Sequence, residues 1–134
     1  MRLFSILIFF LVFFSCTTKE KNKEVKLTKQ IELSKDSKIF YGNRLFSEKK
    51  CITCHAINKK KIGPSVVEII KVYNEKNGNI IAFLKGKSKP IVDTNSSQVA
   101  IMKANIDGFL KEVGIVELDA ISTYMLHVND LKNK

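Results

Sequence analysis

The chain has 134 residues, of which 45% are hydrophobic and 27% are charged, and its formal net charge is +10. This length suggests one folded domain, and the apolar content excludes an intrinsically disordered chain. The charge does not indicate a nucleic-acid-binding protein, because the lysines are spread along the chain and no nucleic-acid-binding motif accompanies them. A basic surface that favours acidic partners is the simpler interpretation.

The chain begins with the pattern of an export signal. Met1 and Arg2 form a short basic start, and residues 3–14 are an apolar run. A helix needs about 20 residues to span a bilayer, so this run is too short and predicts a secretory signal instead. The run ends in "FFSC", which resembles the lipobox of bacterial lipoproteins, although Phe13 stands where leucine is usual. The resemblance implies cleavage before Cys16 and acylation of its thiol; an ordinary signal with an incidental cysteine is the alternative.

The next segment has the composition of a tether. Residues 16–36 alternate charges of both signs and contain no aromatic residue. Their few apolar side chains are too sparse to form a core, so the segment cannot offset its ordering entropy by burial. We therefore divide the chain into a signal peptide at residues 1–15, a lipid-attached flexible tether at 16–36 and a folded domain at 37–134. A surface helix within the tether is the alternative.

Helical spacing dominates the first half of the expected domain. A helix is predicted over residues 38–50, with Asp36 or Ser37 as its N-cap. A second helix is predicted to open at Pro64, because proline suits the first helical position. A short third helix is expected over residues 78–84 and ends near Gly86.

The second half is less regular until its last helix. Residues 87–114 show little periodic pattern, whereas residues 116–128 form an apolar helical stripe. Gly114 and Glu117 precede that stripe like a capping box without its hydroxyl. No paired strands are apparent, so we predict an all-α domain of three to five short helices with long loops. Long loops need a reason, and a large buried cofactor would supply the missing apolar mass.

The motif "CITCH" places Cys51, Cys54 and His55 within five residues. A zinc site would need His127 as a fourth ligand, and adjacent Cys54 and His55 suit tetrahedral chelation poorly. A thioredoxin-like pair needs a strand–helix–strand context that the sequence lacks, and a disulfide leaves His55 without a role. Covalent haem attachment uses all three residues: two thioethers to the vinyl groups and a histidine beneath the iron. We therefore predict haem, with zinc and a disulfide as alternatives.

These residues resemble the small class I cytochromes c over nearly the whole of residues 37–134. Gly42 and Phe46 precede the motif with the family's spacing, and Ile121 and Tyr124 lie on the last helix. The resemblance implies the cytochrome c fold, with the first and last helices packed together around one haem. It also implies that the carbonyl of Pro64, nine residues after His55, accepts a hydrogen bond from the proximal imidazole.

The resemblance also assigns the sixth iron ligand. Met102, which lies 47 residues after His55 in the irregular segment, stands where the family supplies its distal sulfur. Asn105 matches a position that hydrogen-bonds near that sulfur, while Ala104 stands where proline is common. Met125 lies in the apolar stripe of the last helix, where methionine commonly fills gaps. His127 is a rival ligand, but its place near a helix C-terminus favours a surface role.

This ligand set would leave the iron no open position, so the expected function is one-electron transfer rather than catalysis. The protein would be held by its lipid on the extracytoplasmic, periplasmic side of a membrane. It would exchange electrons with acidic redox proteins such as an oxidase, reductase or dehydrogenase, without a small-molecule substrate or nucleic acid. Five lysines that flank the motif would steer docking: Lys49, Lys50, Lys59, Lys60 and Lys61. The alternative is a haem sensor in which the methionine bond is labile or absent.

Overall fold

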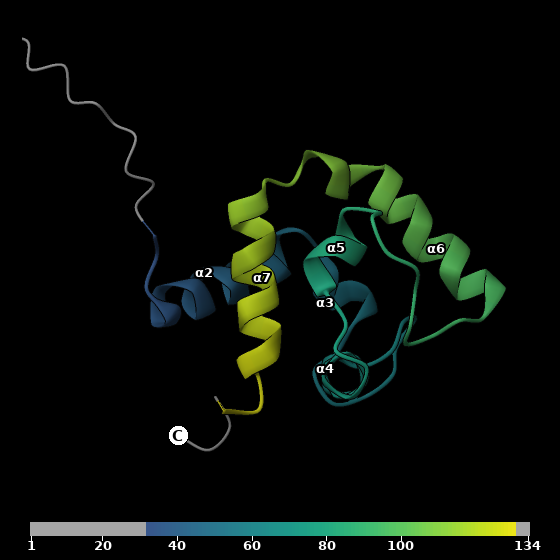
Figure 1. Ribbon diagram of the computed structural model, residues 1–134, viewed down its shortest axis with the longest axis horizontal. Helices are drawn as coiled ribbons and strands as arrows, with labels where there is room; N and C mark the ends of the chain where they lie inside the picture. Colours follow the sequence, from purple (N-terminus) through teal and green to yellow (C-terminus); the bar gives the residue numbers. More distant parts are fainter. Residues whose placement is uncertain (1–31, 131–134) are drawn as a thin grey trace, which may run out of the picture. The chain divides into compact units, whose positions relative to one another are not determined.

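The computed structural model describes residues 32–130, and the folded chain in this range is built from helices (Figure 1). The α-helices are α2 Lys35–Glu48, α3 Cys51–Cys54, α4 Val66–Glu75, α5 Ile80–Leu84, α6 Ser96–Asp107 and α7 Ile115–His127, and the 3-10 helix η1 spans Phe109–Glu112. Between residues 32 and 130 the structure has no β-strand, only an isolated bridge between His55 and Lys60. The all-α prediction is confirmed, but the six α-helices exceed the expected three to five. The expected signal peptide, Cys16 and most of the expected tether lie outside the described residues.

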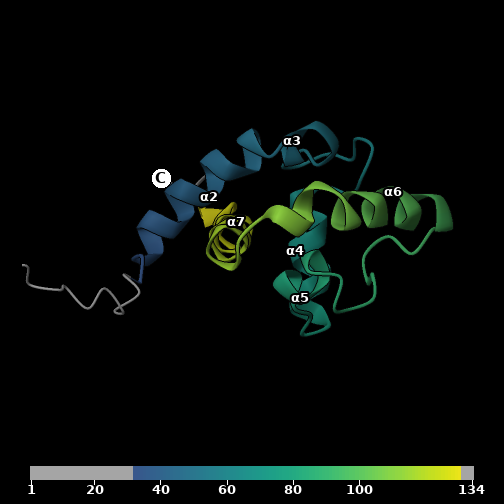
Figure 2. The same ribbon diagram turned by 90° about the horizontal axis from the view of Figure 1, so that it is seen from above.

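The longest-range contact joins the first and last described helices. Figures 1 and 2 both show α2 crossing α7, as the resemblance implies. Gly42 sits at the crossing, where an added Cβ would lie 2.0 Å from the carbonyl oxygen of Ala120. The rings of Phe46 and Tyr124 pack beside it with their centroids 5.6 Å apart. Only glycine therefore allows the two backbones to approach this closely.

Two helix starts differ from the sequence prediction because serine side chains cap them. Ser34 accepts a hydrogen bond from the Ser37 amide at 3.2 Å, so α2 begins before the predicted caps, Asp36 and Ser37. Ser65 accepts from the Glu68 amide at 3.1 Å, so α4 begins after Pro64 rather than at it. A serine oxygen satisfies a free amide of the first turn in both cases.

The remaining predicted helices are present with small changes at their ends. Asn79 caps α5 by accepting a hydrogen bond from the Ala82 amide at 2.8 Å, and Gly86 follows the helix with a φ of +68°. At α7, the Glu117 carboxylate accepts from the Gly114 amide at 2.9 Å. This bond is the half of a capping box that does not require a hydroxyl at the first position.

The segment predicted to be irregular contains a helix, which corrects the sequence analysis. Helix α6 occupies Ser96–Asp107 and η1 follows it at once, so residues 87–114 are not a long loop. No residue of α6 is buried in the protein. The helix therefore lacks the core-facing apolar stripe on which the prediction relied. Figures 1 and 2 both show α6 away from the crossing of α2 and α7.

The buried side chains form two separate clusters. The larger joins α2, α4, α5 and α7, and the smaller consists of Leu110, Val113 and Leu118. Met102 and Ile106 of α6 pack against the smaller cluster. None of the described helices is both long enough and apolar enough to cross a membrane.

Candidate functional site

The Cys-x-x-Cys-His motif forms one short helical turn. Cys51 and Cys54 are the first and last residues of α3, and the His55 amide donates to the Cys51 carbonyl at 2.9 Å. The chain enters this turn through Lys50, whose φ of +59° is left-handed and breaks the path of α2. Both thiols are free and half-buried. The turn therefore presents two thiols and an imidazole together.

A hydrogen bond fixes the orientation of the imidazole. His55 Nδ1 lies 2.8 Å from the carbonyl oxygen of Pro64, which is the contact that the resemblance implied. A carbonyl oxygen can only accept, so Nδ1 must carry the proton of this hydrogen bond. In the tautomer that binds a metal, Nε2 would supply its lone pair, and the hydrogen bond from Nδ1 to the carbonyl holds the ring in place.

Gly63 makes room for this histidine. An added Cβ at Gly63 would lie 2.5 Å from Cε1 and 2.9 Å from Nδ1 of His55. The Gly63 amide also donates to the Cys54 carbonyl at 3.1 Å. Gly63 was not among the site residues predicted from the sequence. The sequence signal that could have identified Gly63 was its position directly before Pro64. The predicted hydrogen bond between His55 and the Pro64 carbonyl places the imidazole beside position 63, where only a small residue fits.

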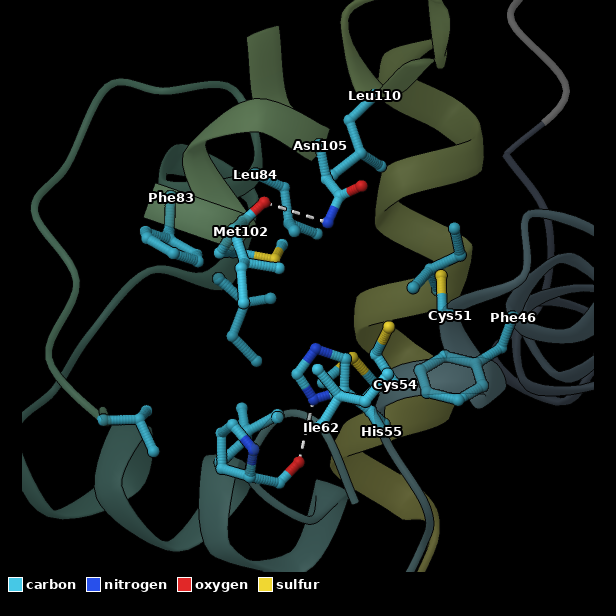
Figure 3. Close-up of a pocket in the computed structure, with 18 of the residues that line it drawn as sticks. Phe46, Cys51, Cys54, His55, Ile62, Phe83, Leu84, Met102, Asn105 and Leu110 are labelled. Carbon is cyan, nitrogen blue, oxygen red and sulfur yellow. Dashed lines mark hydrogen bonds between the residues drawn. The ribbon is translucent and has the colours of Figure 1, made fainter. Parts of the chain in front are cut away.

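These groups face a large apolar cavity of about 630 Å³. Sites that enclose organic cofactors commonly have volumes of roughly 300–1,000 Å³. Every described helix contributes to the lining, whose apolar members include Phe46, Ile69, Ile80, Phe83, Leu84, Ile101, Phe109, Leu110, Ile121 and Met125. Figure 3 shows several of these side chains around the space between Met102 and His55. The cavity, the two thiols and the free imidazole nitrogen fit a covalently attached haem.

Met102 lines the cavity from a different element than His55 does. It lies on α6 and is half-buried, whereas His55 follows α3. Figure 3 shows the two residues on opposite sides of the space. The prediction that Met102 lies in an irregular segment is wrong. It stands on a helix, so its backbone is held by the helical hydrogen bonds around it.

Asn105 also lines the cavity, but its hydrogen bond differs from the expected one. Its side-chain amide donates to the Ile101 carbonyl of the same helix at 3.1 Å. Residues four apart share one face of a helix, so the helical form of α6 explains this contact. Among the described residues, the Asn105 side chain makes no hydrogen bond to Met102.

Of the two rival ligands, His127 lies outside the cavity lining, whereas Met125 contributes to the lining from the core of α7. His127 Nδ1 lies 2.8 Å from the Thr123 carbonyl, and His127 is not part of the lining. Met125 is 6% exposed and belongs to the larger core cluster. In residues 32–130, no three His, Cys, Asp or Glu side chains lie close enough together to hold a metal ion. The arrangement does not support the zinc alternative.

Burial changes the acidity of two groups at the cavity. It raises the pKa of the Cys51 thiol, whereas thiols of redox-active pairs have a lowered pKa. This direction is a further argument against a thioredoxin-like redox pair. Burial also raises the pKa of Tyr73 to about 12, so its hydroxyl stays protonated at neutral pH.

A second wall of the cavity was missing from the sequence analysis. Pro90, Ile91, Val92 and Asp93 line it from the segment between α5 and α6. Two lysines hold this segment: Lys76 Nζ donates to the Ile91 carbonyl at 3.1 Å, and Lys60 pairs with Asp93 at 3.3 Å. The apolar triplet "PIV" was the available signal, but it is too short for a periodicity argument.

An all-α domain whose helices surround an apolar cavity, with a Cys-x-x-Cys-His turn on its wall, defines the class of the c-type cytochromes. The family model described as Cytochrome c matches residues 39–129, and the chain belongs to the cytochrome c family. Its haem c is bound covalently through Cys51 and Cys54. Proteins of this family generally carry electrons rather than act as enzymes, and their domains are typically extracytoplasmic. A search of curated proteins found no match.

Proposed function

We propose that this protein is a membrane-tethered one-electron carrier of the small class I type, in which His55 and Met102 hold the haem iron from opposite sides. The observation that carries the proposal is the placement of these two side chains across one apolar cavity. The haem supplies the one-electron chemistry, and methionine ligation favours a higher reduction potential than a second histidine would. With both residues bound to the iron, no position would be left for a substrate.

The protein's own groups prepare the site for this role. The Pro64 carbonyl holds His55 through Nδ1, and Gly63 leaves the ring unobstructed. Helix α6 fixes the backbone of Met102. The mostly apolar lining of the cavity would limit the number of water molecules around a bound haem and so limit rearrangement when the charge of its iron changes. Asn105 lines the cavity beside Met102, and its side-chain amide donates to the Ile101 carbonyl of the same helix.

The N-terminal proposals rest on sequence alone. We infer that residues 1–15 are removed as a lipoprotein signal, that Cys16 is acylated, and that the following residues tether the domain, at 37–134, to a membrane on the periplasmic side. A carrier held in this way would meet its redox partners close to the membrane surface. Acidic proteins are the partners that suit the positive charge.

Replacing Met102 with alanine tests the proposed ligand set. The oxidised wild-type protein should absorb weakly at the red end of the visible spectrum, as iron–sulfur ligation does, and Met102→Ala should lose this band. Met125→Leu is the matched control, because Met125 packs in the core and the substitution conserves volume. It should keep the band.

Carbon monoxide binding separates the carrier from a sensor. The reduced wild-type protein should bind carbon monoxide poorly, since Met102 would occupy the sixth position, and Met102→Ala should bind it readily. A wild-type protein without the red band that takes up carbon monoxide readily would contradict the carrier and favour the sensor. Survival of the band in Met102→Ala would disprove the assignment of Met102.

A further inference from the structure

Lys61 is bound to the haem-attachment turn by its side chain. Its Nζ donates a hydrogen bond to the carbonyl oxygen of Ile52 at 2.9 Å. Ile52 lies between Cys51 and Cys54, the two residues that carry the thioethers. The lysine therefore reaches back nine residues to the middle of the attachment segment.

The loop around Lys61 is folded against the same turn by its backbone. The Lys61 amide donates to the Gly63 carbonyl at 3.2 Å, and the Gly63 amide donates to the Cys54 carbonyl at 3.1 Å. The last carbonyls of a helix have no partner within it, and α3 has only four residues. Among the described residues, the ammonium of Lys61 is the hydrogen-bond donor to the Ile52 carbonyl. The side chain therefore completes the hydrogen bonding of this turn.

The charge of Lys61 also differs from that of two neighbouring lysines. Lys49 pairs with Glu117 at 3.2 Å and Lys60 pairs with Asp93 at 3.3 Å, so a carboxylate compensates each of them. Within residues 32–130, Lys61 forms no salt bridge. Its positive charge is held beside the attachment segment and is uncompensated. A fixed positive charge favours the state of the site that has gained an electron.

We propose that Lys61 is a positioning residue that holds the haem-attachment turn through the Ile52 carbonyl and raises the reduction potential through its fixed charge. This inference rests on the proposed one-electron function and deepens it. The side chain is exposed, so water and salt weaken the effect of the charge. The contribution is therefore modest and depends on ionic strength.

Three variants test the inference by spectroelectrochemical titration. Lys61→Met removes the charge and the hydrogen bond, Lys61→Arg keeps both, and Lys59→Met removes a charge from the same loop. Lys59 is exposed, and no residue of the described chain forms an ion pair with it. At low salt, Lys61→Met should lower the ratio of reduced to oxidised protein at a fixed applied potential by roughly two- to fourfold. Lys61→Arg should match the wild type, and Lys59→Met should shift the ratio less.

Salt separates the charge from a purely structural role. Raising the ionic strength should bring the wild-type potential toward that of Lys61→Met, because a charge effect is screened. A Lys61→Met shift no larger than that of Lys59→Met, or one that persists unchanged in high salt, would overturn the inference. A wild-type-like potential in Lys61→Met would do the same.

A substitute variant and a visible spectrum complete the test. If Lys61→Met fails to retain haem, Lys61→Gln takes its place, with the same expected shift and the same contrary outcomes. The visible spectrum of each variant reports haem content and ligation before any titration. A wild-type protein without a reversible one-electron couple would refute the proposed function itself. A reversible couple whose reduction potential does not change when Lys61 is replaced would refute only this inference.

Discussion

Gly63 is the residue at which one added methyl group should be felt most directly at the site. A Cβ there would lie 2.5 Å from the ring of His55, closer than side chains approach one another. We expect Gly63→Ala to displace the imidazole, weaken its hydrogen bond to Pro64 and lower the free energy of unfolding by about 1–3 kcal/mol. Denaturant unfolding gives the stability, and the visible spectrum reports the ligation.

Gly114→Ala is the matched control for this substitution. A Cβ at Gly114 would meet its nearest neighbour, a Glu117 carboxylate oxygen, at 3.6 Å, which is ordinary contact. Gly114 is also the N-cap of α7, and alanine caps a helix less well than glycine, so the control should cost about 0.5–1 kcal/mol but leave the visible spectrum unchanged. Equal effects of the two substitutions would show that the space beside His55 does not limit the residue at position 63.

Single residues also mark how far sequence could predict the site. The roles of Cys51, Cys54 and His55 were accessible, because a five-residue motif carries its chemistry in its spacing. The hydrogen bond of the Asn105 side chain could not be predicted from the sequence, because its acceptor depends on whether the backbone is helical. Gly63 was missed for a related reason: its constraint comes from a ring eight residues away in sequence, and only the folded loop brings the two together.

At the scale of elements, the cofactor cavity explains which helices could be predicted from the spacing of apolar residues. Helices α2, α4 and α7 bury apolar side chains against other protein segments, so their apolar residues recur at helical spacing. Helix α6 instead offers Ile101 and Met102 to the cavity and buries no residue in the protein. Ile101 and Met102 would therefore face a bound haem, which is not part of the amino-acid sequence, while Met102 and Ile106 also pack against the smaller cluster. The sequence of α6 therefore lacks the apolar stripe that a helix has when it packs against a protein core.

The start of α7 depends on one carboxylate, which gives a pH prediction. The Gly114 amide and then Lys49 lower the pKa of Glu117 below its ordinary value. The stability gained from this ionised group is present above the pKa of the unfolded chain and is lost as pH falls through the lower, folded-state pKa. We expect Glu117→Gln to cost about 1 kcal/mol at neutral pH. The variant should also lose less stability than the wild type on acidification.

Denaturant unfolding at neutral and acidic pH checks this prediction. Glu112→Gln is the control, since Glu112 is exposed in η1 and forms no ion pair within the described residues. It should leave both the stability and its pH dependence near the wild-type values. If Glu117→Gln behaves like Glu112→Gln, the carboxylate does not stabilise the helix start.

At the scale of the whole molecule, the cavity replaces a conventional core. The two clusters of buried side chains both border it: Phe46 and Ile121 belong to the larger cluster and Leu110 to the smaller. Protein interiors are close-packed, and an apolar cavity of about 630 Å³ would be costly if it stayed empty. The sequence predicted this shortage of core from its long unpatterned segment, although that segment proved to be partly helical. The haem is therefore a structural element of the fold as well as its redox centre.

The overall positive charge predicts how fast the molecule meets a partner. Attraction between a basic protein and an acidic one raises the association rate and is screened by salt. We expect the rate of electron exchange with an acidic redox protein to fall as ionic strength rises. Lys59→Gln should lower the rate at low salt and flatten its salt dependence, because Lys59 flanks the attachment turn. Stopped-flow mixing at several ionic strengths measures both quantities.

A second lysine variant distinguishes the effect of where a charge lies from the effect of the total charge on the rate of electron exchange. Lys71→Gln removes the same unit of charge, but Lys71 lies on α4 with its side chain 72% exposed and outside the cavity lining. If electrons pass near the thioethers, Lys59→Gln should slow the reaction more than Lys71→Gln does. Equal slowing would mean that only the total charge matters, and a rate indifferent to salt in the wild type would remove electrostatic steering altogether. A larger effect of Lys71 would place the docking face on α4, away from the attachment turn.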